Sequence, residues 1–559
     1  MPHVITQSCC SDGSCVYACP VNCIHPSPDE PGFATAEMLY IDPAACVDCG
    51  ACVSACPVGA IAPDTKLTPE QLPFIELNAS FYPKREGKLP PTSKLAPVLD
   101  APVVYRRPGG PLRVAVVGSG PAAMYAADEL LTQEGVQVNV FEKLPTPYGL
   151  VRAGVAPDHQ TTKRVTGLFD RIAAKDGFGF YLNVEVGSDI THDELLEHHH
   201  AVLYAVGAPN DKRLQVEGMD LPGTATATEV VAWYNGHPDY IDLPVNLSGD
   251  RVVIIGNGNV ALDVGRILTA DPDTLAGTDI ADHALTALRA SQVQEVVIAA
   301  RRGPAASAFT LPELIGLTST CEVVLDALDH DRVLADLAAT TDALTRNKLE
   351  VLSKLGSAST PITRPRIRLA YGLTPARVLG DTEATGVEFT VTGSDQVEQM
   401  PAGLVLTSIG YRGKAIPALP FDDENAVVPN AGGRVLEPAS ERPVAGTYVA
   451  GWIKRGPTGF IGTNKSCAAE TVHNLVADYN EGRLRDPHHK PGAIGRFVRG
   501  RKPDVVDARG WAAIDDAERT RGGATRPRDK FTAVTDMLDA AADAPSRPLH
   551  QRLLAGLLR

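Results

Sequence analysis

Residues 112–123 read LRVAVVGSGPAA, an apolar run followed by the fingerprint G-x-G-x-x-A. We expect a strand, a tight turn at Gly118, close approach of a pyrophosphate to Gly120, and a helix that packs on the strand through small Ala123. The N-terminus of that helix offers N–H groups to phosphate. The next apolar run ends in Glu142, near the separation at which an acid binds ribose hydroxyls. These features predict a dinucleotide-binding βαβ unit.

A second copy of this pattern lies further along the chain, where residues 251–261 read RVVIIGNGNVA. The strand expected at 295–300 ends in Arg301 and Arg302 where the first copy has a glutamate. Two guanidiniums suit the 2′-phosphate of NADP, whereas the alternative interpretation is a surface arginine pair in a loop. The chain is therefore predicted to be an α/β protein with two dinucleotide sites, the first for the adenine ribose of FAD and the second for NADPH.

Cysteines dominate the N-terminal region, where nine of the eleven in the chain fall within the first 56 residues. Residues 46–57 read CVDCGACVSACP, which has the C-x2-C-x2-C-x3-C-P spacing of bacterial ferredoxins. In such proteins three thiolates hold one [4Fe–4S] cluster and the fourth ligates a second cluster. We expect Cys46, Cys49 and Cys52 to share a cluster and Cys56 to serve the other one.

An upstream copy of this frame ends at Cys19 and has Asp12 where the second thiolate would be. We expect a [3Fe–4S] cluster on Cys9, Cys15 and Cys56, because the position of the missing thiolate would lose its iron. The alternative is a second [4Fe–4S] cluster in which the carboxylate of Asp12 binds a labile fourth iron.

Other kinds of cysteine site fit this pattern less well. A zinc ribbon uses two separated C-x2-C pairs, and a disulfide scaffold needs an oxidising compartment, for which we see no signal peptide. Cys10 and Cys23 lie off both frames and are interpreted as buried small residues. The predicted iron ligands are Cys9, Cys15, Cys19, Cys46, Cys49, Cys52 and Cys56.

Charge and composition limit the remaining function classes. A net charge of −15 argues against nucleic-acid binding, and no apolar run approaches the about 20 residues of a membrane-spanning helix. We therefore expect a cytoplasmic protein with neither a nucleic-acid nor a membrane partner. Residues 1–62 contain six carboxylates and no Lys or Arg, which suits an acidic ferredoxin-like domain. Residues 63–111 are rich in proline and are predicted to be a semi-rigid linker.

From about Leu112 onward the chain resembles the adrenodoxin-reductase family of ferredoxin–NADP reductases. The blocks that carry the resemblance are 148–152 (YGLVR), 154–159 (GVAPDH), 301–313 and 451–459 (GWIKRGPTG). The resemblance implies an FAD domain with an inserted NADP domain, and the chain departs from the family by its ferredoxin-like N-terminus. The implied segments are 112–208 and 376–480 for FAD, 209–375 for NADP and 481–559 for a helical C-terminal extension.

The same resemblance implies the site residues. Flavin contacts, added to Gly118 and Gly120 of the fingerprint, fall on Ala122, Glu142, Leu150, Val186, Trp452, Gly459, Phe460 and Ile461. NADP contacts fall on Asn257, Gly258, Asn259, Val260, Arg301, Arg302, Glu313 and Gly459. His159, Asp263 and Glu313 occupy positions near the flavin–nicotinamide junction and are expected to orient the rings and balance protons; the alternative for His159 is that it only fixes a loop.

The expected activity follows from these cofactors. NADPH gives a hydride to FAD, which passes single electrons to the iron–sulfur clusters and on to a redox partner such as a ferredoxin or a cytochrome P450. One alternative is an electron-input subunit of a larger enzyme, of the kind found in glutamate synthase. Another is a redox sensor, although no DNA-binding motif is present.

Overall fold

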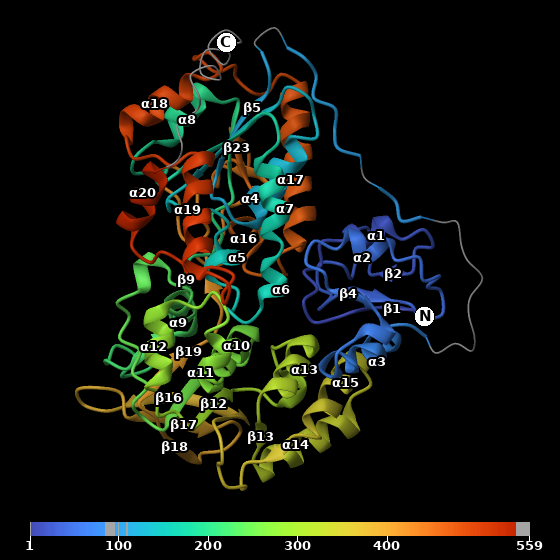
Figure 1. Ribbon diagram of the computed structural model, residues 1–559, viewed down its shortest axis with the longest axis vertical. Coiled ribbons are helices and arrows are strands. Elements are labelled where there is room, and N and C mark those ends of the chain that lie inside the picture. The colour runs from blue at the N-terminus through green and yellow to red at the C-terminus, as the bar shows by residue number, and fades with distance from the viewer. Residues whose placement is uncertain (1, 84–94, 99, 108–109, 544–559) are drawn as a thin grey trace.

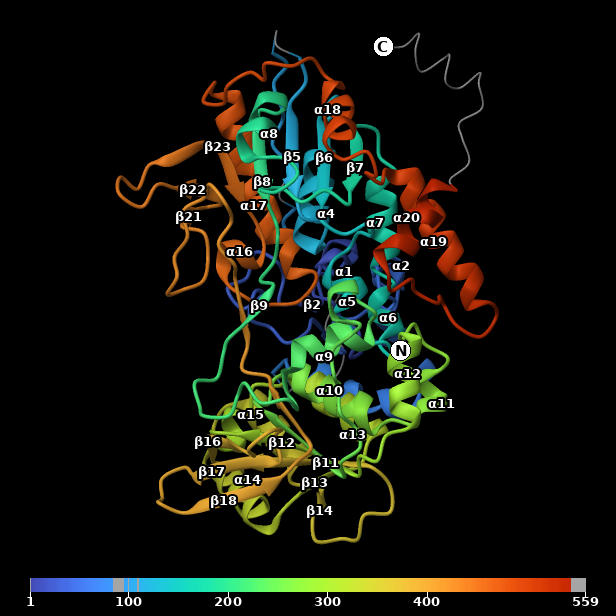
Figure 2. The same ribbon diagram turned by 90° about the vertical axis from the view of Figure 1, so that its left-hand side faces the viewer.

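The computed structural model describes residues 2–83, 95–98, 100–107 and 110–543. Two α/β domains lie one above the other, and a small module sits beside their junction (Figure 1). A turn of the view by 90° keeps the same stacking, with α9 to α12 below α5 and α6 (Figure 2). No helix in this described part of the chain is both long and apolar enough to cross a membrane.

The upper domain is built on a seven-stranded sheet with the order β21-β22-β23-β8-β5-β6-β7. Its parallel strands carry apolar residues on both faces because helices cover both sides, and all of β5 is buried. Helix α17 packs along α4 on one face. The strands are β5 (Arg113–Val117), β6 (Gln137–Glu142), β7 (Phe178–Leu182), β8 (Ala201–Tyr204), β21 (Asn430–Ala431), β22 (Arg434–Leu436) and β23 (Pro443–Val449). The helices are α4 (Pro121–Leu130), α5 (Leu150–Ala153), α6 (Gln160–Lys163), α7 (Thr166–Ala173), α8 (His192–His198), α16 (Trp452–Arg455) and α17 (Thr463–Asn480).

The lower domain has a second seven-stranded sheet, of order β10-β19-β11-β12-β15-β13-β14. Its strands are β10 (Thr224–Thr226), β11 (Arg251–Ile255), β12 (Glu295–Ala300), β13 (Val323–Leu325), β14 (Gly356–Ser357), β15 (Arg366–Tyr371) and β19 (Leu404–Thr407). Its helices are α9 (Ala227–Tyr234), α10 (Asn259–Thr269), α11 (Pro272–Leu275), α12 (Asp282–Arg289), α13 (Leu311–Thr320), α14 (Ala327–Ala339) and α15 (Ala343–Leu352). An antiparallel meander follows, of β16 (Leu373–Leu379), β17 (Gly386–Val391) and β18 (Val397–Pro401).

The boundary predicted at residue 375 is therefore wrong. Strand β19 lies between β10 and β11 and pairs in parallel with both, so the lower domain extends to about residue 407. The two chain crossings between the domains pair with each other as the antiparallel strands β9 (Asn210–Asp211) and β20 (Tyr411–Arg412). Residues 376–407 thus belong with the segment expected to bind NADP, because sheet pairing joins them to it.

The N-terminal module contains two small antiparallel pairs, β1 (His3–Ile5) with β4 (Ile61–Pro63) and β2 (Ile24–His25) with β3 (Tyr40–Ile41). Two five-residue helices, α1 (Ser14–Ala18) and α2 (Ala51–Ala55), lie within the two cysteine frames. The module continues through α3 (Pro73–Ser80), whose Asn78 Oδ1 accepts from the backbone N–H groups of Ile5 and Ile41 at 3.2 and 3.0 Å. The predicted boundary at residue 62 is therefore also wrong, and part of the supposed linker is core.

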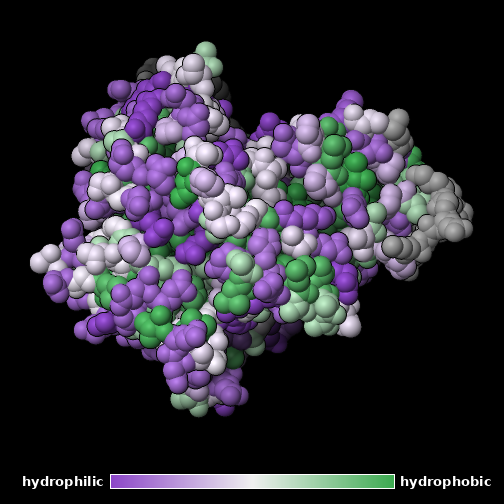
Figure 3. Space-filling view, turned by 90° about the horizontal axis from the view of Figure 1, so that it is seen from below, coloured by the Kyte–Doolittle hydropathy of each residue, from purple (hydrophilic) through white to green (hydrophobic). Residues whose placement is uncertain are grey.

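The linker and the C-terminal helices attach to the rest of the molecule at defined points. Asn480 Nδ2 donates to Val103 O at 2.8 Å, and Arg107 lies over the ring of Tyr479 at 4.5 Å. The C-terminal region comprises α18 (Ala493–Arg501), α19 (Ala508–Gly522) and α20 (Val534–Ala542). It bridges both large domains, because Glu518 pairs with Arg152 of the upper one and the ammonium of Lys530 lies 3.1 Å from Asp279 of the lower one. Seen from below, the surface is mainly polar with scattered apolar patches (Figure 3).

Candidate nucleotide and iron–sulfur sites

The first fingerprint forms a turn that only glycine can make. Gly118 has φ of 97°, and a Cβ on it would lie 2.5 Å from Ala205 O. Gly120 immediately precedes α4, and no atom lies within 4 Å of an added Cβ, so its backbone is open to a ligand. Glu142 accepts from Ser119 Oγ at 2.7 Å, and burial raises the pKa of this carboxyl group. A carboxylate has further lone pairs for ribose hydroxyls, so the residues fit an FAD pyrophosphate and ribose.

The other predicted flavin contacts come from three segments. Gly451, with φ of 75°, brings the turn before Trp452 against the fingerprint helix, since a Cβ there would lie 2.6 Å from Ala122 Cβ. The Trp452 indole N–H donates to Thr458 O at 3.0 Å, and its ring lies 5.0 Å from that of Tyr411. The segment then runs through Gly459, Phe460 and Ile461 into α17. Leu150 is the first residue of α5 and is exposed. Val186 forms an isolated β-bridge with Ile190.

The second fingerprint repeats the first. Gly256 has φ of 111°, and a Cβ there would lie 2.2 Å from Ser408 O, whereas Gly258 is open. Asn257 Nδ2 is buried and has no hydrogen-bond partner among the described residues. Asn259 Oδ1 accepts from Thr310 N at 2.8 Å, which ties the start of α10 to the start of α13. An open backbone and an unpaired buried amide are what a bound dinucleotide would satisfy.

The remaining predicted NADP contacts lie at the edge of this turn. Val260 is partly buried in the first turn of α10. Arg301 and Arg302 follow β12 and are exposed, and within the described part of the chain neither guanidinium forms an ion pair. Two free cationic side chains beside an open phosphate-binding turn are chemically suited to a 2′-phosphate.

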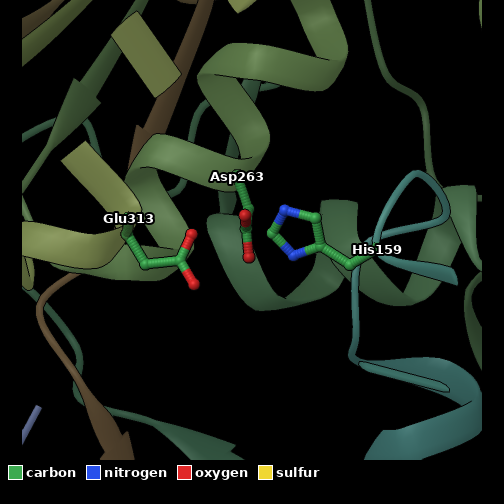
Figure 4. Close-up of side chains that lie close together, drawn as sticks. All are labelled: His159, Asp263 and Glu313. Atoms are coloured by element: carbon green, nitrogen blue, oxygen red, sulfur yellow. The ribbon is translucent and has the colours of Figure 1, made fainter. Parts of the chain in front are cut away.

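His159, Asp263 and Glu313 meet at the junction of the two large domains (Figure 4). One donor atom from each lies within 4.8 Å of the others, although they come from the loop before α6, from α10 and from α13. Arg266 Nη2 donates to Asp263 Oδ1 at 2.8 Å. Burial and the neighbouring Asp263 raise the pKa of Glu313. The donor set is chemically able to bind a cation, and it lies between the two dinucleotide folds.

The two cysteine frames have the same backbone. Ser11 and Gly13 have φ of 57° and 73°, and their counterparts Asp48 and Gly50 have φ of 59° and 74°. Asp12 therefore occupies the structural position of Cys49. Both carboxylate oxygens of Asp12 accept hydrogen bonds from Ser14, one from its backbone N–H at 3.3 Å and one from its hydroxyl.

The second frame surrounds a cavity close to the surface. Its lining includes four of the predicted ligands together with His3 and Cys23, and the four are Cys19, Cys46, Cys49 and Cys52. Cys49 is exposed. Thiolates from both frames thus meet here, with Cys19 arriving from the upstream frame as the C-x3-C-P spacing requires.

The first frame is buried against the upper domain. Gly462 N donates to Cys10 O at 2.7 Å, and a Cβ on Gly462 would lie 2.2 Å from the backbone N of Asp12. Cys10 belongs to the apolar core of the upper domain, and Cys9 and Cys56 pack against that core. The predicted set Cys9, Cys15 and Cys56, with Asp12, therefore lies on the side of the module that faces the flavin domain.

Sequence reasoning missed the contacts of three residues in this module. Cys10 was interpreted only as a buried small residue, but its carbonyl forms the contact with Gly462. Cys23 Sγ lies 3.4 Å from Cys19 Sγ at the second cavity. Gln7 Nε2 donates to Glu313 Oε2 at 2.8 Å. The sequence signal for these residues is their nearness to the cysteine frames, which does not indicate the distant partners of Cys10 and Gln7, Gly462 and Glu313.

Comparison with known proteins gives consistent matches along the chain. The family described as "4Fe-4S binding domain" matches residues 39–62, and the one described as "Pyridine nucleotide-disulphide oxidoreductase" matches residues 112–271. The "Probable ferredoxin/ferredoxin--NADP reductase" of Mycobacterium tuberculosis is 70% identical over 100% of this chain and 98% of its own length. The protein of the same name from Mycobacterium leprae is 68% identical over 99% of this chain and 100% of its own length.

A solved structure matches the reductase part. That structure, Mycobacterium tuberculosis FprA in complex with NADPH, has a TM-score of 0.72 and 40% identity, and covers 77% of this chain and 100% of its own. The mitochondrial NADPH:adrenodoxin oxidoreductase of Arabidopsis thaliana is 38% identical over 78% of this chain and 96% of its own length. The two-domain fold, the second cysteine frame and these identities agree, and the chain belongs to the family of ferredoxin–NADP reductases that carry their own ferredoxin module.

Proposed function

We propose that electrons cross this ferredoxin–NADP reductase in one direction through the module, entering at the first cysteine frame and leaving at the second. The observation that carries the proposal is the contact of Cys10 and Asp12 with Gly462, beside the predicted flavin residue Ile461. The second frame includes Cys49, which is exposed, whereas residues 10–13 of the first frame are buried. The two frames are thus in series between the FAD domain and solvent.

The residues would hold three kinds of cofactor. When bound, FAD takes a hydride from NADPH and releases electrons singly, and iron–sulfur clusters carry them one at a time. The open backbones at Gly120 and Gly258 suit the two pyrophosphates, and Glu142 suits a ribose. Arg301 and Arg302 would bind the 2′-phosphate of NADPH.

We propose that three residues at the junction orient the nicotinamide and balance protons there during hydride transfer, namely His159, Asp263 and Glu313. Arg266 holds Asp263 in place, because it pairs with Asp158 at 2.6 Å as well as with Asp263. A fixed carboxylate beside a reacting ring can favour one ring geometry without itself reacting.

For the first frame we propose a [3Fe–4S] cluster on Cys9, Cys15 and Cys56. The support is that a carboxylate is a harder ligand than a thiolate, and that Ser14 donates to both oxygens of Asp12 and so competes with an iron for them. The second cluster is proposed to be [4Fe–4S] on Cys19, Cys46, Cys49 and Cys52. The external acceptor is proposed to be a ferredoxin or a cytochrome P450, and the compartment the cytoplasm.

The test of the electron route is EPR spectroscopy on anaerobically purified protein before and after addition of NADPH. We expect a [3Fe–4S] signal in the oxidised sample and a change in the cluster signals when NADPH is added. Clusters that NADPH leaves untouched would contradict the internal route.

The test of nucleotide choice is the double substitution R301A/R302A. Each lost charge-assisted contact lowers discrimination between NADPH and NADH, and we expect a combined loss of at least about tenfold in the ratio of kcat/KM values. An unchanged ratio would contradict the assignment.

A further inference from the structure

The ferredoxin module reaches into the junction of the two nucleotide domains at one point. Gln7, two residues before the first cysteine frame, donates its side-chain N–H to Glu313 Oε2 at 2.8 Å. Glu313 is partly buried and lies with His159 and Asp263 at that junction. The module therefore supplies a hydrogen bond to the group that we propose to orient the nicotinamide.

The helix that carries Glu313 is held by the module at further points. Glu37 Oε2 accepts from the backbone N–H of Leu311, the first residue of α13, at 2.7 Å. Lys348 of α15 lies 3.4 Å from the same carboxylate. Leu311 and Ile315 belong to the apolar core of the module itself. An acidic cap and two buried side chains fix the start of α13 relative to the module.

Gly316 shows how closely Gln7 is fitted. A Cβ at Gly316 would lie 2.2 Å from the Nε2 and Oε1 atoms of Gln7, so any larger residue would push the amide out of its place. This glycine is in the middle of α13, where glycine is unfavourable for the helix relative to alanine, so its conformation alone does not require it. The space that Gly316 leaves is the space that Gln7 fills.

We infer that Gln7 is a positioning residue for hydride transfer, through which the ferredoxin module completes the nicotinamide site of the reductase. The inference rests on the proposed role of Glu313. The amide holds Oε2 of the carboxylate and so restricts the rotamers of a side chain with three rotatable bonds, which keeps the carboxylate beside Asp263 and His159. The rate at which NADPH reduces the flavin then depends on a residue that belongs to the electron-accepting module.

The experiment uses the full-length protein with its cofactors, in which flavin reduction by NADPH is followed anaerobically by stopped flow. The variants are Q7A and E313Q. S80A is the matched control, because Ser80 Oγ accepts from Asn347 at 3.0 Å across the same interface without touching Glu313. We expect Q7A to lower the limiting rate of flavin reduction by roughly tenfold, with the Kd for NADPH and the iron content unchanged, and S80A to match the native protein.

The outcomes separate the inference from the proposed function. If E313Q slows flavin reduction and Q7A does not, the inference about Gln7 is overturned while the role of Glu313 stands. If E313Q leaves the rate unchanged, both are overturned. If S80A slows the rate as much as Q7A, the effect is a general loosening of the interface and the inference is overturned.

Because Gln7 is only two residues from the predicted iron ligand Cys9, a second variant tests the same contact without changing a residue near Cys9. G316A changes a residue of α13 and none of the module, and its added methyl group would displace the side-chain amide of Gln7. We expect G316A to reproduce the slow flavin reduction of Q7A, and the double variant Q7A/G316A to be no slower than Q7A alone, because the two changes break the same contact. A normal rate in G316A, or additive losses in the double variant, would overturn the inference.

Discussion

The two cysteine frames share one backbone and face opposite environments. Residues 10–13 are buried, whereas of the corresponding residues 47–50 the first three are exposed and Gly50 is partly exposed. The glycines and left-handed residues repeat from one frame to the other, so local sequence produced the same turn twice. The two frames differ in what packs against them: Gly462 of the FAD domain packs against Asp12, whereas Cys49, the counterpart of Asp12, is exposed to solvent.

This difference indicates that docking, and not the frames themselves, decides which frame lies against the flavin domain and which one is open to an external protein. A frame buried against the flavin domain can receive electrons but cannot meet an external protein. An exposed frame can meet such a protein, and the acidic character of the module suits a basic partner face. The predictions below exchange or disturb single features of the two frames.

The largest effect is expected from C49D, which gives the exposed frame the residue of the buried one. A carboxylate is a harder ligand than a thiolate, so an exposed iron held by it is easily lost. We expect reduction of protein acceptors to be nearly abolished, while reduction of ferricyanide directly by the flavin persists. V47A, at an exposed position beside the ligand, should behave like the native protein in both assays.

The reciprocal change, D12C, should make the buried frame a copy of the exposed one. Because the backbones already match, the new thiolate is placed to bind a fourth iron, and the [3Fe–4S] EPR signal of the oxidised protein should disappear in favour of a second [4Fe–4S] signal on reduction. An unaltered spectrum would mean that the position of Asp12 does not set the type of cluster.

G462A should weaken the contact on which the comparison depends. Its methyl group would lie 2.2 Å from Asp12 N and would push the buried frame away from the flavin domain. We expect NADPH-driven cluster reduction to slow by roughly tenfold while flavin reduction is unchanged. G167A in α7 is the control, because an added Cβ there meets no atom within 4 Å. Equal rates in G462A and G167A would contradict a functional contact.

The smallest effect is a difference in stability between the two clusters. Mild oxidation in the presence of a chelator should remove iron from the exposed frame before the buried one, because solvent and chelator reach Cys49 more readily than Asp12. EPR and iron analysis during the treatment check the order. Simultaneous loss would show that the cover provided by the FAD domain does not protect the first cluster.

Local patterns predicted much of this molecule. The local sequence predicts both fingerprint turns and the two cysteine frames, and the family resemblance places His159, Asp263 and Glu313 near one junction, where the structure brings them together. Each of the turns is dictated by a few adjacent residues with special backbone needs, such as Gly118 and Gly256.

The features that the sequence did not predict all depend on contacts between residues that are far apart in the chain. The composition of residues 63–82 indicates a linker, but Asn78 satisfies two backbone groups of distant strands and so belongs to the core. The placement of β19 between β10 and β11 depends on pairing across about 180 residues, which periodicity does not encode. Gln7 and Glu313 are 306 residues apart in the sequence, and no local pattern around either residue indicates their contact.

The anchoring of the linker on Asn480 and Tyr479 has a consequence for kinetics. A separate ferredoxin must diffuse to its reductase, so its reduction is second order and slows when the proteins are diluted or the ionic strength is raised. Here the first acceptor is covalently attached and already docked, so its reduction is first order. The rate of that step should stay constant across dilution and salt, and sensitivity to both should appear only when the external acceptor is added.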